Sequence, residues 1–306
     1  MEKFDLGLAY LWEYDKDFIQ LIEQDLQAQG LTTFIIGEHN LYEVGERISE
    51  RSLGFRTYLD RAWDVDDNFG ELGKMLVRRK TVILNQYKRV QHAIDKATMH
   101  LEFITGGIHV PHSIIIPPKS HTADIFLSLS DLANLGRPFI IKPCNTTGGG
   151  TGVVTGAESL EEILLERNNL GNDKYILQEK IYPAMLGNKR AWFRCFWAFG
   201  KPILTWWDDL THCYSILTSD EIQRYKLKKL FSLTKTIANL TGLDFFSTEL
   251  VLSENGLFIA IDYVNDQCDM RLQSKHFDGA PDVVVGQIIE SLRKYILRLK
   301  RTKQID

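Results

Sequence analysis

The first 85 residues alternate short apolar runs with stretches in which apolar residues recur every three or four positions. The runs predict strands and the periodic stretches predict helices. Strands that alternate with helices usually pair in parallel, so a small parallel α/β lobe is expected. The predicted strands are 4–10, 31–36, 55–59 and 81–85, and the predicted helices are 15–29, 41–51 and 67–80.

Polar residues stand at the ends of two of these strands. Asp60 and Arg61 follow the third strand, and Asn85 ends the fourth. Ligands of open α/β sheets bind beyond the carboxyl ends of the strands, which makes the three residues candidates for binding. Residues of these types also cap the loops that follow strands, and the sequence leaves both interpretations open.

The rest of the chain predicts strands and helices in a less regular order. Two strands that flank Gly200 are close enough in sequence to pair in an antiparallel way, and two more follow after residue 244. The expected strands are 109–118, 175–181, 192–199 and 201–207, and the expected helices are 86–104, 121–135, 158–167, 219–240 and 281–298.

Residues 138–156 combine an apolar strand, a lysine and a glycine-rich tip. The run at 139–141 ends in Lys142, and a β-type run resumes at Gly152. Glycines allow close backbone approach, and their amide groups form a concavity that binds anions. The pattern predicts a phosphate-binding hairpin, although a surface hairpin without a ligand has the same pattern. The tip contains Thr146, Thr147, Gly148, Gly149, Gly150 and Thr151.

A second hairpin is predicted around Asn255-Gly256, a strong turn signal between two apolar runs. A two-residue turn there places Glu249 directly opposite Asp262. Like charges in that position destabilise a sheet unless something lies between them, and a hard divalent cation fits. An acidic edge on a solvated sheet face is the alternative. The predicted core face holds Leu250, Leu252, Leu257, Ile259 and Ile261.

Composition and charge narrow the class of protein. The 306 residues are 44% hydrophobic and 25% charged, and the net charge of −4 argues against a general nucleic-acid binder. No apolar run approaches the ~20 residues of a membrane span, and the N-terminus lacks the pattern of a signal peptide. No pair of cysteines shows the C-x-x-C spacing, so we expect reduced thiols in a cytoplasmic protein and no zinc site. The cysteines are Cys144, Cys195, Cys213 and Cys268.

Three further motifs accompany the two hairpins. Asp95-Lys96 precedes a Gly-x-x-x-Pro segment, ILQEKI occupies 176–181, and FRCFWAFGKPI occupies 193–203. With IIKP at 140–143 and the acidic pair, these motifs resemble those of the ATP-grasp superfamily, in the same order. The chain is most similar to the RimK-type and glutathione-synthetase-like ligases, from about Asn85 to Asp266.

The resemblance implies an ATP-grasp fold, of the α/β class, with three lobes. A parallel α/β lobe is expected at 1–84, a central lobe with the glycine-rich hairpin at 85–178, and an antiparallel-sheet lobe with the metal site at 179–306. The resemblance also assigns catalytic roles to Lys142 and Arg194, the latter meeting phosphate or the acyl intermediate. The implied ATP contacts are Lys96, Lys142, Gly148, Gly149, Gly150, Thr151, Gln178, Glu179, Lys180, Ile181 and Asn188. The implied metal ligands are Glu249, Asp262 and Asn265.

The chain departs from the family pattern in three places. The family usually has Asn two residues after the second acidic ligand, whereas here Asn265 comes three residues after Asp262. In a regular strand Asn265 would point to the opposite face, so a bulge or an early strand end must re-aim it, or Asp266 replaces it. Trp192 stands where RimK-type proteins have an aspartate. No acidic residue has the usual spacing for ribose binding, which leaves Asn188 as the candidate.

The function implied by the resemblance is ATP-dependent ligation of a carboxylate to an amine through an acylphosphate, releasing ADP and phosphate. ATP and Mg²⁺ or Mn²⁺ are the implied cofactors. Small-molecule or peptide substrates are expected, with no nucleic acid and no membrane, and a homodimer is common among relatives. One alternative is an ATP-grasp kinase acting on a small-molecule hydroxyl, which the displaced Asn265 and the basic run at 271–276 would suit. Another is a non-catalytic nucleotide-binding protein.

Overall fold

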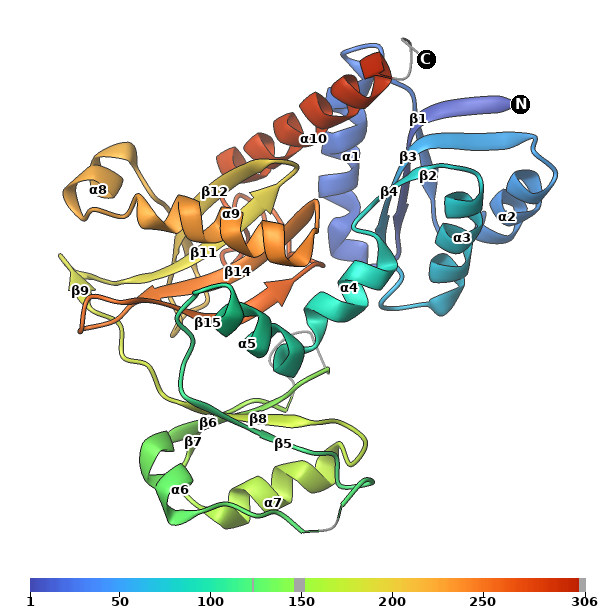
Figure 1. Ribbon diagram of the computed structural model, residues 1–306. Coiled ribbons are helices and arrows are strands. Elements are labelled where there is room, and N and C mark those ends of the chain that lie inside the picture. Colours follow the sequence, from blue (N-terminus) through green and yellow to red (C-terminus); the bar gives the residue numbers. More distant parts are fainter. Residues whose placement is uncertain (123, 146–151, 303–306) are drawn as a thin grey trace.

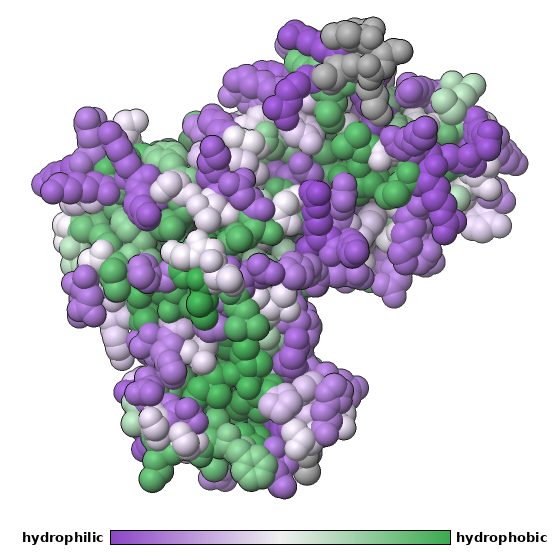
Figure 2. Space-filling model, viewed as in Figure 1, coloured by the Kyte–Doolittle hydropathy of each residue, from purple (hydrophilic) through white to green (hydrophobic). Residues whose placement is uncertain are grey.

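The computed structural model describes residues 1–122, 124–145 and 152–302. These residues form two four-stranded sheets, one five-stranded sheet and a two-stranded ribbon. The sheets lie in three lobes, and the lobe with the β5–β8 sheet projects from the other two (Figure 1). The space-filling view shows the molecule notched between this central lobe and the N-terminal lobe (Figure 2). The tip residues 146–151, which include four predicted ATP contacts, lie outside the described residues.

The N-terminal lobe is the predicted parallel α/β lobe. All its neighbouring strands pair in parallel, and helices connect them. The central strand is apolar at successive positions because both of its faces are covered. In spatial order the strands are β2 (Thr33–Ile36), β1 (Glu2–Tyr10), β3 (Leu53–Arg61) and β4 (Val82–Leu84). The helices are η1 (Glu13–Asp15), α1 (Lys16–Gln27), α2 (Leu41–Ser49) and α3 (Asp67–Arg78).

The central lobe is an antiparallel sheet with two helices and a hydrophobic core of its own. Both helices begin at a capping box, formed by Ser128 with Asp131 and by Ser159 with Glu162. β6 pairs with β7, which confirms that two antiparallel strands flank the glycine-rich tip. The strands, in spatial order, are β5 (Ser113–Ile116), β8 (Tyr175–Glu179), β6 (Phe139–Pro143) and β7 (Val154–Ala157). The helices are α6 (Leu129–Leu135) and α7 (Leu160–Asn169).

The C-terminal lobe contains a five-stranded antiparallel sheet. Helix α9 (Lys229–Thr241) packs on β11 and β12, and the last helix, α10 (Asp282–Thr302), packs on the same strands and on α1. The order of the strands is β13 (Tyr214–Ile216), β12 (Lys201–Trp207), β11 (Trp192–Ala198), β14 (Phe245–Leu252) and β15 (Phe258–Asn265). A small ribbon of β9 (Met185–Leu186) and β10 (Lys189–Arg190) precedes them. Within the described ranges, no helix is both long and apolar enough to cross a membrane.

Two predicted long helices are broken, so those predictions were wrong. The stretch 86–104 forms α4 (Tyr87–Ile94) and α5 (Lys96–Thr105), because Asp95 is extended and its carboxylate caps α5 by accepting from two backbone amides. The stretch 219–240 forms α8 (Ser219–Arg224) and α9, with Lys226 at a positive φ of 57° between them. The predicted helix at 121–135 is also shorter and begins only with α6. Apolar periodicity continues across such breaks and does not reveal them.

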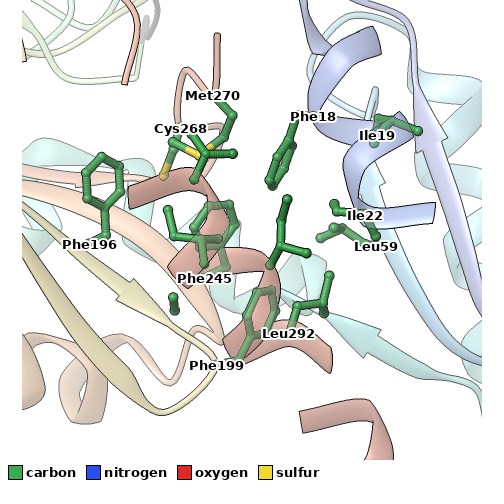
Figure 3. Close-up of a cluster of buried hydrophobic side chains, with 14 of the residues drawn as sticks. Phe18, Ile19, Ile22, Leu59, Phe196, Phe199, Phe245, Cys268, Met270 and Leu292 are labelled. Carbon is green, nitrogen blue, oxygen red and sulfur yellow. The ribbon is translucent and has the colours of Figure 1, made fainter. Parts of the chain in front are cut away.

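One hydrophobic core joins the N-terminal and C-terminal lobes (Figure 3). Side chains of α1 and β3 meet side chains of β11, β14 and α10, and each is almost fully buried. Burial of this kind stabilises by roughly 1.5–3 kcal/mol for each large apolar side chain, so the shared core holds these two lobes together. The joined residues include Phe18, Ile22, Leu59, Phe196, Phe199, Phe245 and Leu292.

Asn85 connects the same two lobes by hydrogen bonds. Its Oδ1 accepts from the backbone N–H groups of Asp244 and Phe245, both at 2.9 Å, and its Nδ2 donates to the carbonyl of Phe245. We expect Asn85→Ala to lower the free energy of unfolding by roughly 2–3 kcal/mol, because backbone groups lose their partners and Ala tolerates the φ of 64° poorly. Urea denaturation measures this. Asn169→Ala, at an exposed position, is the control. Equal losses of stability in both variants would contradict the structural role of Asn85.

Candidate functional site

The two acidic residues expected to face each other do so, since Glu249 of β14 pairs with Asp262 of β15. The route to this register differs from the prediction. Leu252 pairs with Phe258 and Leu250 pairs with Ala260, so five residues form the connection and the predicted two-residue turn was wrong. The predicted core face was wrong as well. The two-residue turn would have paired Leu250 with Ile261, whereas Leu250 pairs with Ala260. A register shift between these pairs makes Ile261 an extra residue and restores the Glu249–Asp262 pairing.

A second register shift places Asn265. Ser247 of β14 pairs with Asn265, whereas Glu249 pairs with Asp262. Ser247 and Glu249 are two residues apart and therefore share a face of the sheet. Their partners Asp262 and Asn265 consequently share that face, although they are three residues apart. Of the expected alternatives the bulge is present, and it brings Asn265 to the face of the acidic pair.

Arg194 and Trp192 of β11 hold Glu249 from the neighbouring strand. Arg194 pairs with Glu249 in register, and its Nη2 lies 2.5 Å from Glu249 Oε1. The indole Nε1 of Trp192 donates to the other carboxylate oxygen at 2.9 Å. The Arg194 guanidinium also lies over the ring of Trp207, with 4.6 Å between its Cζ and the ring centroid. In the sequence Trp192 stands out only as a departure from the family pattern, because the register between β11 and β14 is not visible there.

The two lysine segments meet at the same strands. Lys142 Nζ donates to the carbonyl of Ile261, the extra residue of β15, at 3.1 Å. The backbone N–H of Lys96 donates to the carbonyl of Cys144, directly after β6, at 3.0 Å. The start of α5, the strand before the glycine-rich tip and the acidic strand are thereby connected.

The charges of these side chains shift one another's pKa values. Burial by itself raises the pKa of the Asp262 carboxyl, but the positive charges of Lys96, Lys142 and Arg194 hold that pKa below its usual range. Burial lowers the pKa of Lys142, and the charges of Asp262 and Glu249 partly oppose this. Five of the predicted site residues therefore lie close enough to share one electrostatic environment.

The predicted adenine segment follows the central sheet toward the C-terminal lobe. Gln178 is buried, and its amide donates to the hydroxyl of Tyr263 at 2.7 Å. His100 Nδ1 lies 2.7 Å from the same hydroxyl, and Glu179 accepts from the backbone of His112. These side chains join β8, α5 and β15, a contact that the sequence did not reveal. Their contacts with a nucleotide stay a prediction.

The remaining predicted nucleotide contacts lie at the edge of this region. Lys180 and Ile181 directly follow β8, and Lys180 Nζ lies 6.0 Å from the centroid of the Tyr182 ring. Asn188 is exposed in the turn between β9 and β10. Its assignment to ribose also stays a prediction.

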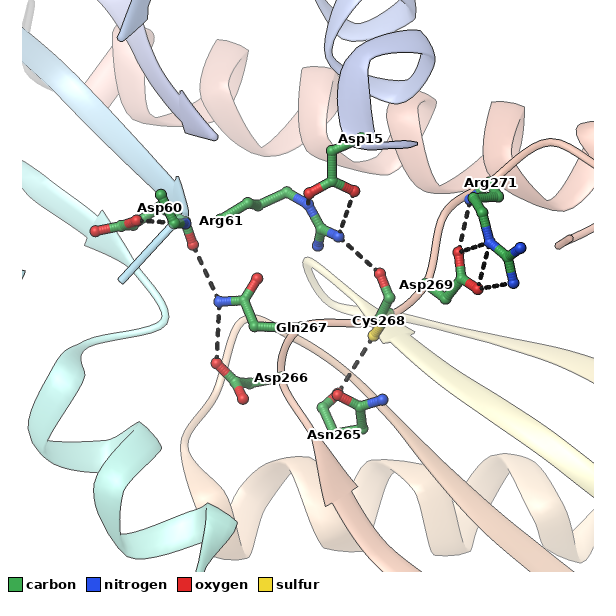
Figure 4. Close-up of polar contacts among 10 residues, drawn as sticks. Asp15, Asp60, Arg61, Asn265, Asp266, Gln267, Cys268, Asp269 and Arg271 are labelled. Carbon is green, nitrogen blue, oxygen red and sulfur yellow. Dashed lines mark hydrogen bonds and ion pairs between the residues drawn. The ribbon is translucent and has the colours of Figure 1, made fainter. Parts of the chain in front are cut away.

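The segment after β15 forms polar contacts with the N-terminal lobe (Figure 4). Arg61 binds both carboxylate oxygens of Asp15, at 2.7 and 2.8 Å, and donates to the carbonyl of Cys268 at 2.8 Å. Asp60 caps its loop by accepting from two backbone amides, and Tyr58 and Tyr87 donate to its carboxylate. Asp60 therefore caps its loop, as one of the two interpretations predicted, whereas Arg61 has other structural partners, Asp15 and the carbonyl of Cys268.

Asp266 points into this junction. Its carboxylate accepts from the indole of Trp63 at 3.3 Å. It also accepts from Gln267 at 3.3 Å (Figure 4). Burial, reinforced by the negative charge of Asp64, raises the pKa of Asp266 to about 6. Because Asp266 has partners in the N-terminal lobe, Asn265 is the better candidate beside Asp262.

The basic run at 271–276 has acidic partners. Arg271 contacts Asp269 at 2.7 Å and Asp278 at 2.9 Å, and Lys275 contacts Asp17 at 2.7 Å. These pairs attach the segment before α10 to itself and to α1. Because Arg271 and Lys275 are paired with acids, the segment is a poorer candidate for binding an anion.

The cysteines are free, and three of them are buried. Burial raises the pKa of Cys144, Cys195 and Cys268 to about 12 in each case, so their thiolate fractions at pH 8 are very small. We expect one thiol, that of the partly exposed Cys213, to react rapidly with Ellman's reagent at pH 8 in the native protein. Unfolding in urea should release all four thiols. Rapid reaction of two or more native thiols would contradict the burial.

The donor atoms fit a hard cation. Glu249, Asp262 and Asn265 offer carboxylate and amide oxygens on one face of the sheet, which suits Mg²⁺ or Mn²⁺. Among residues 1–122, 124–145 and 152–302, no three or more His, Cys, Asp or Glu side chains form a group that could hold a metal. Mg²⁺ held by these three side chains would complete its coordination with oxygens such as those of phosphate and water.

Comparisons with known proteins place the fold. No protein-family model matches the chain, and no curated protein is similar to it in sequence. A RimK domain ATP-grasp protein from Sphaerobacter thermophilus is 20% identical with a TM-score of 0.62, covering 94% of this chain and 98% of that one. D-alanine–D-alanine ligase from Bacillus anthracis, complexed with ATP, is 13% identical with a TM-score of 0.65, covering 99% of each chain.

A third solved structure is that of a ligase with its precursor bound. The ATP-grasp ligase PsnB, complexed with a minimal precursor, Mg and ADP, is 13% identical with a TM-score of 0.61, covering 95% of this chain and 98% of that one. All three matches extend over nearly the whole chain and include each of the three lobes. The protein therefore has the ATP-grasp fold, with similarity to a RimK-type member.

Proposed function

We propose that this protein is an ATP-dependent carboxylate–amine ligase. The observation that supports this most is the convergence of Lys96, Lys142 and Arg194 on the opposed carboxylates of Glu249 and Asp262. Three cations beside two carboxylates suit a site for a metal-bound triphosphate, because phosphate binding needs positive charge and the metal needs oxygen ligands.

In the proposed reaction, a carboxylate oxygen of the first substrate attacks the γ-phosphorus of ATP. The bond to the β-phosphate oxygen breaks, which yields ADP and an acylphosphate. The nitrogen of an amine then attacks the acyl carbon, and phosphate leaves as the amide forms and the amine loses a proton. Lys96, Lys142 and the glycine-rich tip would hold the phosphates, and Arg194 would stabilise charge on the transferred phosphoryl group.

A divalent cation on Glu249, Asp262 and Asn265 would supply Lewis-acid stabilisation of the phosphate oxygens. The chain's own contribution is to orient these groups. Trp192 and Arg194 fix the carboxylate of Glu249, and Lys142 holds the backbone of β15 at the extra residue Ile261. Such positioning reduces the rearrangement needed during phosphoryl transfer.

The substrates are proposed as small-molecule or peptide carboxylates and amines. The similar structures include a D-alanine–D-alanine ligase and a ligase complexed with a precursor peptide, and both substrate types come to this chain only by analogy. We also propose a cytoplasmic location, since free cysteines are typical of proteins in reducing compartments. Pairing of two copies as a homodimer stays a prediction.

The test is phosphate release from Mg·ATP by the purified protein, with a panel of amino acids and short peptides as donors and acceptors. Turnover should require both substrates, and mass spectrometry should find an amide lacking one water relative to the substrates. Binding of ATP without phosphate release across a broad panel would contradict the ligase and favour the non-catalytic alternative.

A kinase remains the second outcome of the same experiment, recognised by a stable product that carries a phosphoryl group on a hydroxyl. The two observations that suggested a kinase, the displaced Asn265 and the basic run at 271–276, receive less support from the structure. The second register shift brings Asn265 to the face of Asp262, and the basic charges at 271–276 are paired. The ligase is therefore the function that the geometry supports better.

A further inference from the structure

Both carboxylate oxygens of Glu249 already have donors from the protein. Arg194 Nη2 contacts Oε1 at 2.5 Å, and Trp192 Nε1 donates to Oε2 at 2.9 Å. The ion pair is largely shielded, since 14% of the Arg194 side chain and 12% of the Glu249 side chain are exposed. A cation that binds Glu249 must compete with Arg194 in an environment that screens charge weakly.

The charges around the pair also oppose a free cation. Lys96, Lys142 and Arg194 act on the carboxylate of Asp262, and Glu249 is the other negative group that acts on Lys142. When all five groups are charged, three positive charges face two negative ones. A divalent cation alone would increase the positive excess, whereas a triphosphate would reverse it.

The small number of metal ligands on this face also argues against binding of a free cation. The described part of the chain provides two opposed carboxylates and one amide on this face, and it has no cluster of three acidic or metal-binding side chains. Mg²⁺ usually keeps several waters and is bound through a few carboxylates together with substrate phosphates. Two carboxylates and one amide by themselves form a weak site for a free Mg²⁺ ion.

We propose that Arg194 closes this site to a free divalent cation, and that the metal enters together with the phosphates of a nucleotide. This inference rests on the proposed function for the identity of the phosphate. The phosphates supply the negative charge that draws Arg194 away from Glu249 and frees a carboxylate oxygen for the metal. Nucleotide and metal then tighten each other's binding by the same factor, as linkage requires.

The first test needs no variant. Free Mn²⁺ is titrated into the wild-type protein and its binding followed by the loss of its electron paramagnetic resonance signal and by calorimetry. We expect no saturable binding up to roughly 1 mM, a Kd equivalent to about −4.1 kcal/mol. ADP should still raise the melting temperature in the presence of EDTA, because the site without a metal has more positive than negative charges and therefore favours an anion. Tight binding of free Mn²⁺ to the wild-type protein would overturn the proposal.

The second test removes the competitor. Arg194→Met deletes the positive charge and frees Glu249 Oε1, so affinity for free Mn²⁺ should rise at least tenfold, about 1.4 kcal/mol. Arg190→Met is the matched control, since Arg190 forms a similar ion pair, 2.7 Å from Asp209, with a partner outside the acidic pair of the site. An unchanged affinity in Arg194→Met, or an equal gain in Arg190→Met, would contradict the role of Arg194.

The two proposals fail in different ways. If no nucleotide binds under any condition, the proposed function fails, while the comparison of free Mn²⁺ binding between wild type and Arg194→Met still decides whether Arg194 guards the carboxylates. If nucleotide binds and Mn²⁺ binds equally well without it, the ligase proposal survives and the gating by Arg194 is wrong. If Arg194→Met does not fold, the wild-type titrations with and without ADP decide.

Discussion

Replacing Asp262 by Asn is expected to reduce phosphate release roughly a thousandfold, the scale found when one electrostatic group is removed from an active site. Asp262 lies directly opposite Glu249, and positive charges hold the pKa of its carboxyl below the ordinary value of 3.8. It is therefore ionised at neutral pH. Asn has nearly the same shape but no charge, so the metal would lose one of its two carboxylates. Phosphate release at saturating Mg·ATP measures the effect.

The same variant has a stability signature that depends on pH. A carboxyl whose pKa is lowered by folding stabilises the protein above its ordinary pKa, and this stabilisation is lost as the pH falls through the folded value. The melting temperature of Asp262→Asn should therefore lie below that of the wild type at pH 7. The difference should shrink as the pH falls below 3.8, the ordinary value.

Glu254→Gln is the control, because Glu254 is an exposed acid in the connection of the same hairpin. It should keep wild-type phosphate release and stability. Turnover at the wild-type rate in Asp262→Asn would remove the acidic pair from the proposed site. Equal losses in both variants would mean that the hairpin, and not the carboxylate of Asp262, determines activity.

Arg61→Met is expected to lower the free energy of unfolding by roughly 3–5 kcal/mol, the cost of breaking a buried ion pair from one side. Arg61 and Asp15 are 4% and 1% exposed, and they share two hydrogen bonds. Met fills similar space but leaves the Asp15 carboxylate buried without a counter-charge. The link from Arg61 to the carbonyl of Cys268, which joins the lobes, is also lost. Urea denaturation measures the change.

Two comparisons isolate the buried pair. Arg61→Met combined with Asp15→Leu should recover much of the loss, because replacing both buried charges removes the unpaired carboxylate. Lys74→Met breaks an exposed pair with Glu71, whose side chains are 61% and 68% exposed, and should change stability by less than about 1 kcal/mol. An Arg61→Met protein as stable as the wild type, or a double variant that recovers none of the lost stability, would contradict this account.

Several features followed from local patterns in the sequence. Alternating apolar runs and periodic stretches predicted the parallel N-terminal lobe, and the strands that flank the glycine-rich tip pair as expected. The identity and order of the motifs sufficed for the ATP-grasp fold, which the similar structures confirm. The broken helices were missed because the capping of α5 by Asp95 satisfies backbone amides without interrupting the apolar period.

The acidic hairpin marks the limit of prediction from sequence. Glu249 and Asp262 were paired correctly, yet from a two-residue turn that does not exist, and a later register shift compensates for the longer connection. A second shift brings Asn265 to the same face. Bulges of this kind depend on hydrogen bonds between strands and on which side chains the surrounding lobes can bury, so local propensity does not specify them.

The sequence alone determined which residue types are present for phosphate and metal chemistry and the order in which the chain supplies them, because strands, turns and motifs are encoded by neighbouring residues. Only the tertiary structure decided their partners. It placed Arg194 and Trp192 on the oxygens of Glu249, Lys142 on the extra residue of β15, and Asn85 and Arg61 in contacts between lobes. These contacts join residues up to 207 positions apart, and the energy of each depends on burial and charge that exist only once the lobes have packed.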